Sequence, residues 1–181
     1  VAMGADLLKG TDIGIRACIG FPLGAMSTEA KVFETKDVIK NGATEIDMVM
    51  NIGAFLSKDY QKVKDDINAV VKAANGNCVK VILENHYLTK EEIAKACQLC
   101  EESGAHFVKT SSGFAPSGAK LDDVIVMRKS VSNNVEVKVA GGVSSFEAFM
   151  QFYNAGATRF GTSKSLKIMN EYDEKMGEVI Y

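Results

Sequence analysis

Short β-branched segments alternate with amphipathic helical segments along the whole chain, and this alternation most constrains the fold. The expected strands cover residues 13–20, 45–51, 79–84, 106–110, 135–140 and 158–161. Helices are predicted at residues 1–9, 28–40, 59–74, 89–103, 121–131 and 145–155. Because no linker or low-complexity segment interrupts the pattern, the sequence predicts one α/β domain built on a parallel sheet.

The predicted helix ends carry residue types that helix termini favour. N-cap positions are assigned to Thr28, Thr89 and Ser145, and the glycines that follow helices are Gly42, Gly76, Gly104 and Gly156. In the helix at 28–40, Val32, Phe33 and Ile39 are expected to form the apolar side. Asn-Gly-Ala, Ser-Gly-Ala and Ala-Gly-Ala recur at 41–43, 103–105 and 155–157, each just before a strand. This repeated joint indicates a barrel.

A complete TIM (β/α)8 barrel usually needs about 250 residues. Six strand-helix units in 181 residues therefore predict a barrel that lacks about its first two strands. The chain opens at Val1, without an initiator Met, in a helix-like stretch. We expect residues 1–181 to form a single (β/α) barrel domain that is truncated at its N-terminus.

Composition argues against polyanion and membrane partners. The 21 basic and 23 acidic residues are interspersed and give a net charge of −2, so the chain has no strong field that would attract nucleic acid or an anionic membrane. Neither a bilayer-spanning apolar run nor a signal peptide is recognisable, and a cytoplasmic location is expected.

The cysteines are expected to be reduced and structural. Cys97 and Cys100 have metal-ligand spacing, but they lie inside the helix predicted at 89–103 and lack a second pair to complete a zinc site. We expect no metal.

Side chains alternate along a strand, so one face of each barrel strand meets the helices and the other faces the interior. The apolar, outward set is Ile46, Met48, Met50, Val79, Val81, Leu83, Val135, Val137 and Val139. The inward set is Glu45, Asp47, Val49, Asn51, Lys80, Ile82, Glu84, Phe107, Lys109, Glu136, Lys138 and Ala140. Glu45 and Lys80, at strand starts, are interpreted as a structural ion pair. Asp47, Glu84, Lys109 and Lys138 lie nearer the carboxyl ends, where barrel chemistry occurs, and are functional candidates.

Two neighbouring lysines have a chemical consequence. The charge of one, together with partial burial, lowers the pKa of the other and supplies a neutral amine that attacks carbonyls. The resulting iminium accepts electrons when a nearby carbon–carbon bond breaks, and an enamine forms. A carboxylate can then move the protons, and Asp47 is the candidate.

Five ordered motifs carry a resemblance to a known family. They are Gly-Phe-Pro-Leu-Gly at 20–24, Glu-Ile-Asp-Met-Val-Met-Asn at 45–51, Phe-Val-Lys-Thr-Ser-Ser-Gly-Phe at 107–114, Lys-Val-Ala-Gly-Gly at 138–142 and Arg-Phe-Gly-Thr-Ser at 159–163. From its start to about Met169 the chain resembles the deoxyribose-phosphate aldolases. The resemblance implies a class I aldolase, without a cofactor, that reversibly splits 2-deoxy-D-ribose 5-phosphate into acetaldehyde and D-glyceraldehyde 3-phosphate.

Site residues follow from the matched motifs. Lys109 corresponds to the Schiff-base lysine, Lys138 to the lysine that tunes it and Asp47 to the proton-shuttling acid. Glycines let backbone N–H groups approach an anion, and barrels often hold phosphate in the loops after the last two strands. The substrate- and phosphate-binding candidates are Thr110, Gly113, Gly141, Gly142, Gly161, Ser163 and Lys164.

The chain departs from the family pattern at a few positions. Ser144 stands where many relatives have arginine, and Lys164 stands where a small residue is common, so the phosphate-binding charge is expected to have moved to the next loop. His86, in the unusual Asn85-His86 pair, is interpreted as a surface or hydrogen-bonded residue, and His106 as structural.

Two other functions remain open at this point. One is another Schiff-base barrel aldolase, similar to transaldolase, with a different donor. The other is a non-catalytic barrel fragment that binds phosphates or pairs with another chain through its open edges. The expected partners are a small phosphorylated sugar and a second copy of the chain in a homodimer, with no nucleic acid and no membrane.

Overall fold

The computed structural model describes residues 1–178. The strands are β1 (Arg16–Ile19), β2 (Glu45–Val49), β3 (Cys78–Ile82), β4 (Phe107–Lys109), β5 (Glu136–Ala140) and β6 (Arg159–Gly161). The helices are α1 (Ala2–Leu7), α2 (Thr28–Lys40), α3 (Ile52–Leu56), α4 (Tyr60–Ala73), the 3-10 helix η1 (Asn85–Tyr87), α5 (Lys90–Glu102), α6 (Leu121–Lys129), α7 (Phe146–Asn154) and α8 (Ser165–Glu178).

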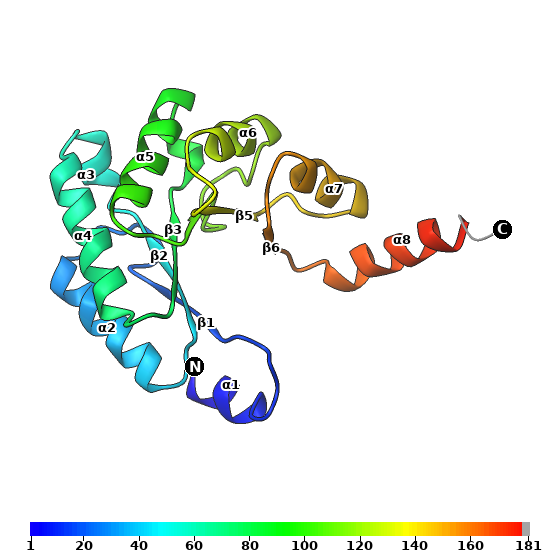
Figure 1. Ribbon diagram of the computed structural model, residues 1–181, viewed down its shortest axis with the longest axis horizontal. Helices are drawn as coiled ribbons and strands as arrows, with labels where there is room; N and C mark the ends of the chain where they lie inside the picture. The colour runs from blue at the N-terminus through cyan, green and yellow to red at the C-terminus, as the bar shows by residue number, and fades with distance from the viewer. Residues whose placement is uncertain (179–181) are drawn as a thin grey trace.

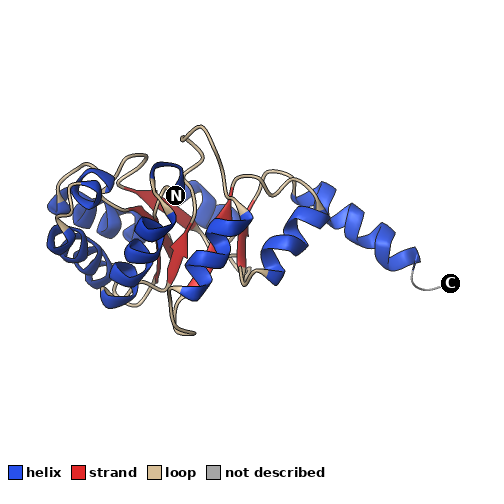
Figure 2. Cartoon of the chain, turned by 90° about the horizontal axis from the view of Figure 1, so that it is seen from above, coloured by secondary structure: helices blue, strands red, loops and turns tan. Residues whose placement is uncertain are grey.

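The six strands form one parallel sheet in the order β1-β2-β3-β4-β5-β6. The sheet curves, and helices α2 to α6 cover its outer side, as Figure 1 shows. Seen from above in Figure 2, the strands lie against this helical layer, while α8 extends away from it. The architecture is a parallel half-barrel whose inner face is open on the side without helices.

The predicted alternation of strands and helices is confirmed. Each expected strand is present with ends that differ by a few residues, and α2 has the predicted bounds. Glycines 42, 76, 104 and 156 all have positive φ after their helices, as expected for C-terminal caps. The helices α3 and α8 and the 3-10 helix η1 were not predicted.

The assignment of strand faces is also confirmed. The outward set from Ile46 to Val139 is buried in one large core between the sheet and the helices. On the inner face a small separate apolar cluster contains Val49, Ile52 and Ile82, with Phe21 packed against it. The other inward positions of the strands are mostly polar or charged, so the inner face is where binding or chemistry is to be sought.

Two predictions for α2 were wrong. The side chain of Phe33 is not on the apolar side, because the residue is 74% exposed. Lys31 is buried instead, since its ammonium group pairs with Asp66 of α4 and donates to the carbonyl of Val49 at 3.0 Å. The N-cap is Ser27 and not Thr28, because the Ser27 hydroxyl accepts from the N–H of Ala30 while Thr28 bonds to Asp66.

The cysteine pair lies in the core. Cys97 and Cys100 are fully buried on α5, and burial raises the pKa of the Cys97 thiol to about 12. Both thiols therefore have a structural role, as expected. Among residues 1–178, no three His, Cys, Asp or Glu side chains are grouped to hold a metal ion. His106 is structural as predicted, because its Nδ1 accepts the N–H of Val79 at 3.0 Å.

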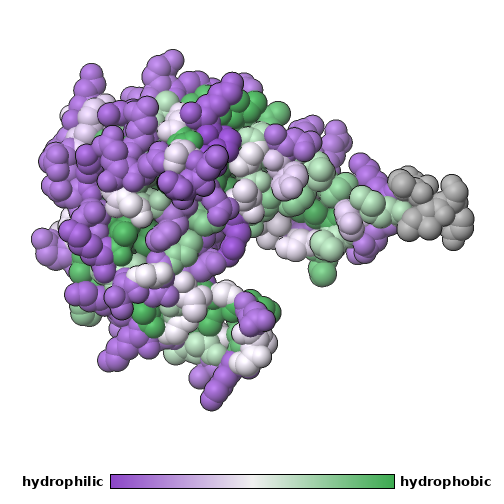
Figure 3. All heavy atoms as spheres, in the orientation of Figure 1, coloured by the Kyte–Doolittle hydropathy of each residue, from purple (hydrophilic) through white to green (hydrophobic). Residues whose placement is uncertain are grey.

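Helix α8 buries little of its surface. Of the α8 side chains whose exposure is described, Ile168 is buried. Phe146, Phe149 and Tyr153 of α7 line an apolar groove with Tyr172 and Met176 of α8. In Figure 3 the surface is indented between the end of the molecule that carries α1 and the arm formed by α7 and α8.

No helix within residues 1–178 is long and apolar enough to cross a bilayer.

Candidate active site

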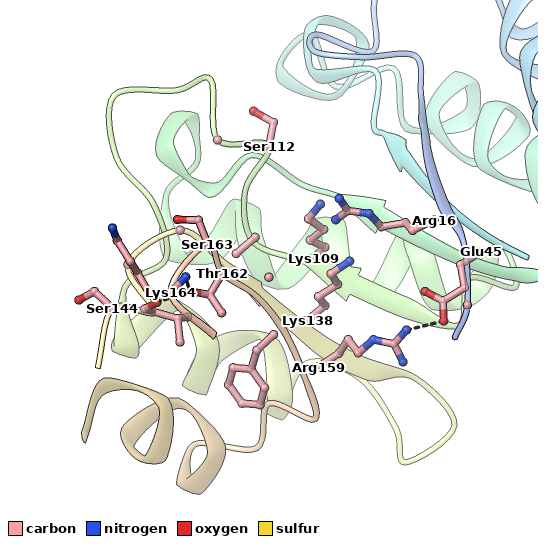
Figure 4. Close-up of a pocket in the computed structure, with 18 residues that line it drawn as sticks. Arg16, Glu45, Lys109, Ser112, Lys138, Ser144, Arg159, Thr162, Ser163 and Lys164 are labelled. Carbon is pink, nitrogen blue, oxygen red and sulfur yellow. Dashed lines mark hydrogen bonds and ion pairs between the residues drawn. The ribbon is translucent and has the colours of Figure 1, made fainter. Parts of the chain in front are cut away.

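A hollow of about 800 Å³ opens on the inner face of the sheet. Lys109 and Lys138 point into it beside each other in Figure 4, with Arg16 and Arg159 on the same side and Lys164 toward the opposite end. The loops after β4, β5 and β6 supply most of the remaining lining. Because parallel strands end at one edge, their following loops meet there and surround the two lysines.

The strand register places the inner side chains in rows. Val49 pairs with Ile82, Ile82 with Lys109, Lys109 with Lys138, and Lys138 with Arg159. Side chains of register partners in a parallel sheet share a face, so this row changes from apolar on β2 and β3 to cationic on β4, β5 and β6. We call it the lysine row. One level below it, Asp47 pairs with Lys80 and Lys80 with Phe107.

Asp47 lies beneath the lysine row and is fully buried. Its Oδ2 atom accepts hydrogen bonds from Lys109 Nζ and Lys138 Nζ, both at 2.8 Å. Arg16 reaches the same oxygen at 3.4 Å. Lys80 Nζ lies 3.2 Å from Oδ1, but among the described residues Oδ1 has no hydrogen-bond partner. One carboxylate oxygen therefore joins the two lysines that the sequence singled out.

This arrangement shifts two pKa values. Burial by itself would raise the pKa of Asp47, but the charges and hydrogen bonds of Lys109 and Lys138 outweigh it and hold the pKa well below its usual range. Burial lowers the pKa of Lys138 to about 8, although the Asp47 carboxylate opposes this, and the Lys109 charge lowers it further. The site therefore combines an ionised carboxylate with a lysine that loses its proton near neutral pH.

A second ion-pair group lies nearer the amino ends of the strands. The Glu45 carboxylate accepts from Lys80 Nζ at 2.7 Å and also pairs with Arg159. Lys80 is completely buried, and its ammonium group lies 5.8 Å from the centre of the Phe107 ring. The structural interpretation of Glu45 and Lys80 is confirmed, with Arg159 as an additional member.

The candidate phosphate-binding residues surround the far end of the hollow. Gly141 and Gly142, after β5, have φ values of 77° and 83°. Gly118 lies so close to this loop that a Cβ added to Gly118 would lie 2.8 Å from the carbonyl carbon of Gly141. The end of β6 contributes Gly161 to the lining, and the loop after it contributes Thr162, Ser163 and Lys164. The two loops are joined because Thr162 Oγ1 donates to the carbonyl of Val143 at 2.7 Å. The expected residues thus lie together around one space.

The loop after β4 is held by Glu84. This buried residue has a left-handed backbone, with φ of 56°, and its carboxylate accepts from both the N–H and the hydroxyl of Ser112. Gly113 follows and lines the hollow. Glu84 therefore fixes the loop that adjoins Lys109.

Thr110 does not reach this space. It is fully buried, donates to the carbonyl of Ala140 at 3.2 Å and accepts the N–H of the same residue at 3.1 Å. It ties β4 to β5. His86 lies at the surface and contacts Ser117 through Nδ1 at 2.8 Å, as the sequence interpretation expected.

Sequence reasoning missed Arg16, Ser112 and the site position of Arg159. Arg16 could have been found, since Ala17 and Ile19 are buried in the outer core and alternation then turns Arg16 inward. Ser112 had no detectable signal, because its position depends on the loop conformation that Glu84 imposes.

Comparisons with known proteins agree on one family. Residues 18–168 match the DeoC/LacD family aldolase. Two relatives named deoxyribose-phosphate aldolase, from Mycoplasma capricolum subsp. capricolum and Streptococcus sanguinis, are 54% and 53% identical over 94% and 93% of the chain, and the match covers 77% of each relative. A tetrameric deoxyribose phosphate aldolase from Aeropyrum pernix superposes with a TM-score of 0.86 at 29% identity, over 96% of this chain and 74% of that one.

Proposed function

Because the chain belongs to the DeoC/LacD aldolase family, we propose that it is a class I deoxyribose-phosphate aldolase. The reaction is the reversible cleavage of 2-deoxy-D-ribose 5-phosphate into acetaldehyde and D-glyceraldehyde 3-phosphate. The observation that carries the proposal is the pair of amines, Lys109 and Lys138, on one buried carboxylate oxygen of Asp47.

In our proposal Lys109 is the nucleophile. Its neutral amine adds to the substrate aldehyde carbon and, after water leaves, an iminium joins that carbon to Nζ. The bond between the second and third sugar carbons then breaks as the hydroxyl on the third carbon loses its proton and becomes the new aldehyde. The bonding electrons move toward the iminium and leave an enamine, while glyceraldehyde 3-phosphate departs. Protonation of the enamine carbon and hydrolysis of the imine release acetaldehyde and restore the amine.

Asp47 and Lys138 are assigned the proton transfers. The low pKa of Asp47 keeps its carboxylate ionised, and the pKa of Lys138, about 8, lets that amine exchange a proton near neutral pH. The hydrogen bonds of both lysines to Oδ2 support this assignment, because they give a direct route between the two amines.

The phosphate is assigned to the loops after β5 and β6. Gly141, Gly142 and Gly161 allow close approach of backbone N–H groups, Ser163 supplies a hydroxyl and Lys164 supplies the positive charge. Gly113 closes the side next to Lys109. For Thr110 we retain a supporting role, in which it holds β4 against β5.

We also propose that the six strands belong to a closed eight-stranded barrel, in a single domain that includes residues 1–181. The chain matches 77% of the length of its curated relatives, and β1 and β6 each have one paired edge among residues 1–178. Two further strands would connect those edges. A homodimer and a cytoplasmic location complete the proposal, and light scattering of the purified protein tests the dimer.

Borohydride trapping tests the assigned chemistry. Incubation with acetaldehyde and reduction should add a two-carbon group to Lys109, detected by peptide mass spectrometry, and the Lys109→Arg variant should lose the adduct. Lys80, which is buried in the Glu45 ion pair, provides an internal control and should remain unmodified. Modification of Lys138 in place of Lys109 would reverse the assigned roles, and no adduct would contradict the proposed function.

The donor distinguishes the proposal from a transaldolase-like enzyme. Acetaldehyde should form the trapped adduct readily, whereas dihydroxyacetone should not. The reverse preference would identify the other class of Schiff-base aldolase.

A further inference from the structure

Arg16 is the third cation at the Asp47 oxygen, and neither the family match nor the sequence motifs assign it a role. Its Cα pairs with that of Glu45 in the register of β1 and β2, yet its guanidinium extends to Asp47 Oδ2. Glu45 is already engaged by Lys80 and Arg159. Arg16 therefore has no carboxylate of its own among the described residues and shares the one that the lysines use.

The ion pairs connect seven side chains into one network. Five are cationic and two are anionic: Arg16, Lys80, Lys109, Lys138 and Arg159 against Glu45 and Asp47. The network carries an excess of positive charge when all members are ionised. Such an excess is relieved when one lysine loses its proton, so each added cation favours a neutral amine.

Oδ2 has room for about two strong hydrogen bonds, because a carboxylate offers roughly four acceptor positions over its two oxygens. The two lysines occupy those positions at 2.8 Å, and Arg16 stays at the longer distance of 3.4 Å. When a lysine amine becomes neutral, it loses its charge and becomes a weaker donor to Oδ2. When its nitrogen enters a neutral imine, it has no N–H left to donate. The Arg16 guanidinium is the nearest remaining cation and cannot itself lose a proton.

We propose that Arg16 is a positioning residue that holds Asp47 in place and ionised while Lys109 leaves it to react, and that favours the neutral state of the lysine amines. This inference deepens the proposed function, on which it depends. Arg16 acts through Asp47 and does not touch the reacting carbonyl.

Other groups around the lysines do not duplicate this role. The charged and titratable side chains at inward positions of the strands are Arg16 and Cys18 of β1, Glu45 and Asp47 of β2, Cys78 and Lys80 of β3, Glu136 of β5 and Arg159 of β6; Glu84 follows β3, and Lys164 lines the far end of the hollow. Glu136 accepts from Thr158, and Glu84 holds Ser112. Arg159 is similar to Arg16 in exposure, at 47% against 43% of the side chain, but its charge is balanced by Glu45. It is therefore the matched control.

The test measures the pH at which the Lys109 and Lys138 amines lose their protons, with and without substrate, in the variants Arg16→Gln, Arg16→Lys and Arg159→Gln. Trace acetic anhydride labels neutral amines, so the labelling of Lys109 and Lys138 against pH reports their pKa values independently of activity. In Arg16→Gln the midpoint of at least one lysine should rise by about half to one pH unit, because a neighbouring cation is lost. Trapping with acetaldehyde should weaken about three- to tenfold at pH 7 and recover at higher pH.

Arg16→Lys keeps the charge, so the labelling midpoints of Lys109 and Lys138 should equal those of the unmodified protein. Arg159→Gln should shift these midpoints less than Arg16→Gln does. Unchanged midpoints in Arg16→Gln, or equal shifts in the Arg159 control, would overturn the proposal. Thermal melting identifies a variant that fails to fold, and if Arg16→Gln does so, Arg16→Met, which also removes the charge, takes its place. Absent trapping in the unmodified chain would contradict the proposed function, whereas the labelling would still decide whether Arg16 controls the amines.

Discussion

Asp47 is the residue on which the interior charges converge, and its ionisation links the site to stability. The folded-state pKa of Asp47 is lowered, so the carboxylate binds its proton less readily in the folded than in the unfolded chain. Its stabilising contribution is therefore present above the unfolded pKa, about 4, and is lost as pH falls toward the folded pKa.

We expect Asp47→Asn to lower the free energy of unfolding at pH 7 by about 3 kcal/mol, because buried lysines lose their shared partner. The variant should also lose less stability than the unmodified protein between about pH 4 and pH 2. Urea unfolding at several pH values measures both effects. Glu102→Gln, which removes an exposed pair with Lys64, is the control and should change little. Parallel acid profiles for the unmodified chain and Asp47→Asn would refute the linkage.

Lys164 is the residue expected to replace the arginine charge in the phosphate site. It is exposed and lines the hollow beside Ser163. Lys164→Ala should raise KM for the phosphorylated sugar about tenfold, since an exposed charge-assisted contact contributes roughly 1 kcal/mol or a little more and a factor of ten is about 1.4 kcal/mol. Turnover of unphosphorylated deoxyribose should be nearly unchanged, because the lost contact acts on the remote anion. Steady-state kinetics with both sugars decides, and equal losses would show a role in the fold or the chemistry.

At the scale of elements, the loop after β1 is fitted tightly to the end of β2. Gly24 has a φ of 65°, and a Cβ added there would lie 2.1 Å from the carbonyl oxygen of Met50. Gly76, after α4, also has a positive φ of 88° but has no atom within 4 Å of an added Cβ. Both glycines have a left-handed backbone, but only Gly24 is in close contact with other atoms. Substituting each in turn therefore separates the energetic cost of the backbone conformation from that of a steric clash.

Gly76→Ala should cost about 1 kcal/mol of unfolding free energy, the usual cost of a left-handed backbone with a side chain. Gly24→Ala should cost more than about 3 kcal/mol or prevent folding, because the backbone itself must move. Chemical denaturation of both variants gives the comparison. Similar losses of unfolding free energy in the two variants would mean that the backbone of the loop after β1 can move at little energetic cost.

The elements also show where sequence reasoning succeeds and where it stops. Strand faces were predictable, because one side of each strand is apolar and the other carries charge. The face of α2 was not, since the burial of Lys31 depends on Asp66, a partner from another helix that hydropathy does not reveal. The five-residue helix α3 was missed because it is too short for a periodic pattern, although Asn51 caps it.

The candidate site was predictable only in part. Lys109, Lys138 and Asp47 could be placed together, since each lies inward on its strand. Arg16 escaped because alternation was applied to the charged strands β2 to β5 and not to β1. Thr110 stands next to a motif lysine, but it follows the end of β4 and its hydroxyl bonds to the backbone of Ala140, so it does not line the hollow.

On the scale of the whole molecule, the burial of strand residues decreases toward both edges of the sheet. The residues of β2 and β3 are almost all buried, whereas those of β6 are exposed or half-buried. Helices α4 and α8 have equal lengths of 14 residues, but α4 buries Val63, Asp66, Ile67 and Val70. Helix α8 has Ile168 as its buried residue among those described.

Hydrogen exchange should follow this gradient. Amides of β2, β3 and α4 should be the most protected, and those of α8 should exchange through local opening without unfolding of the sheet. Mass spectrometry of peptides from 60–73 and 165–178 compares the two helices directly. Equal protection would mean that α8 is covered in solution by another copy of the chain or a further segment.

The lysine row has a consequence for how a substrate enters. Its apolar end at Val49 and Ile82 and its cationic end at Lys138 and Arg159 lie on opposite sides of Lys109. Val49 and Ile82 are fully buried and do not line the hollow, whereas Lys109, Lys138 and Arg159 do, so an anionic group in the hollow meets only the cationic part of the row. We therefore expect the anionic end of a substrate to be drawn toward β5 and β6 before any bond is made.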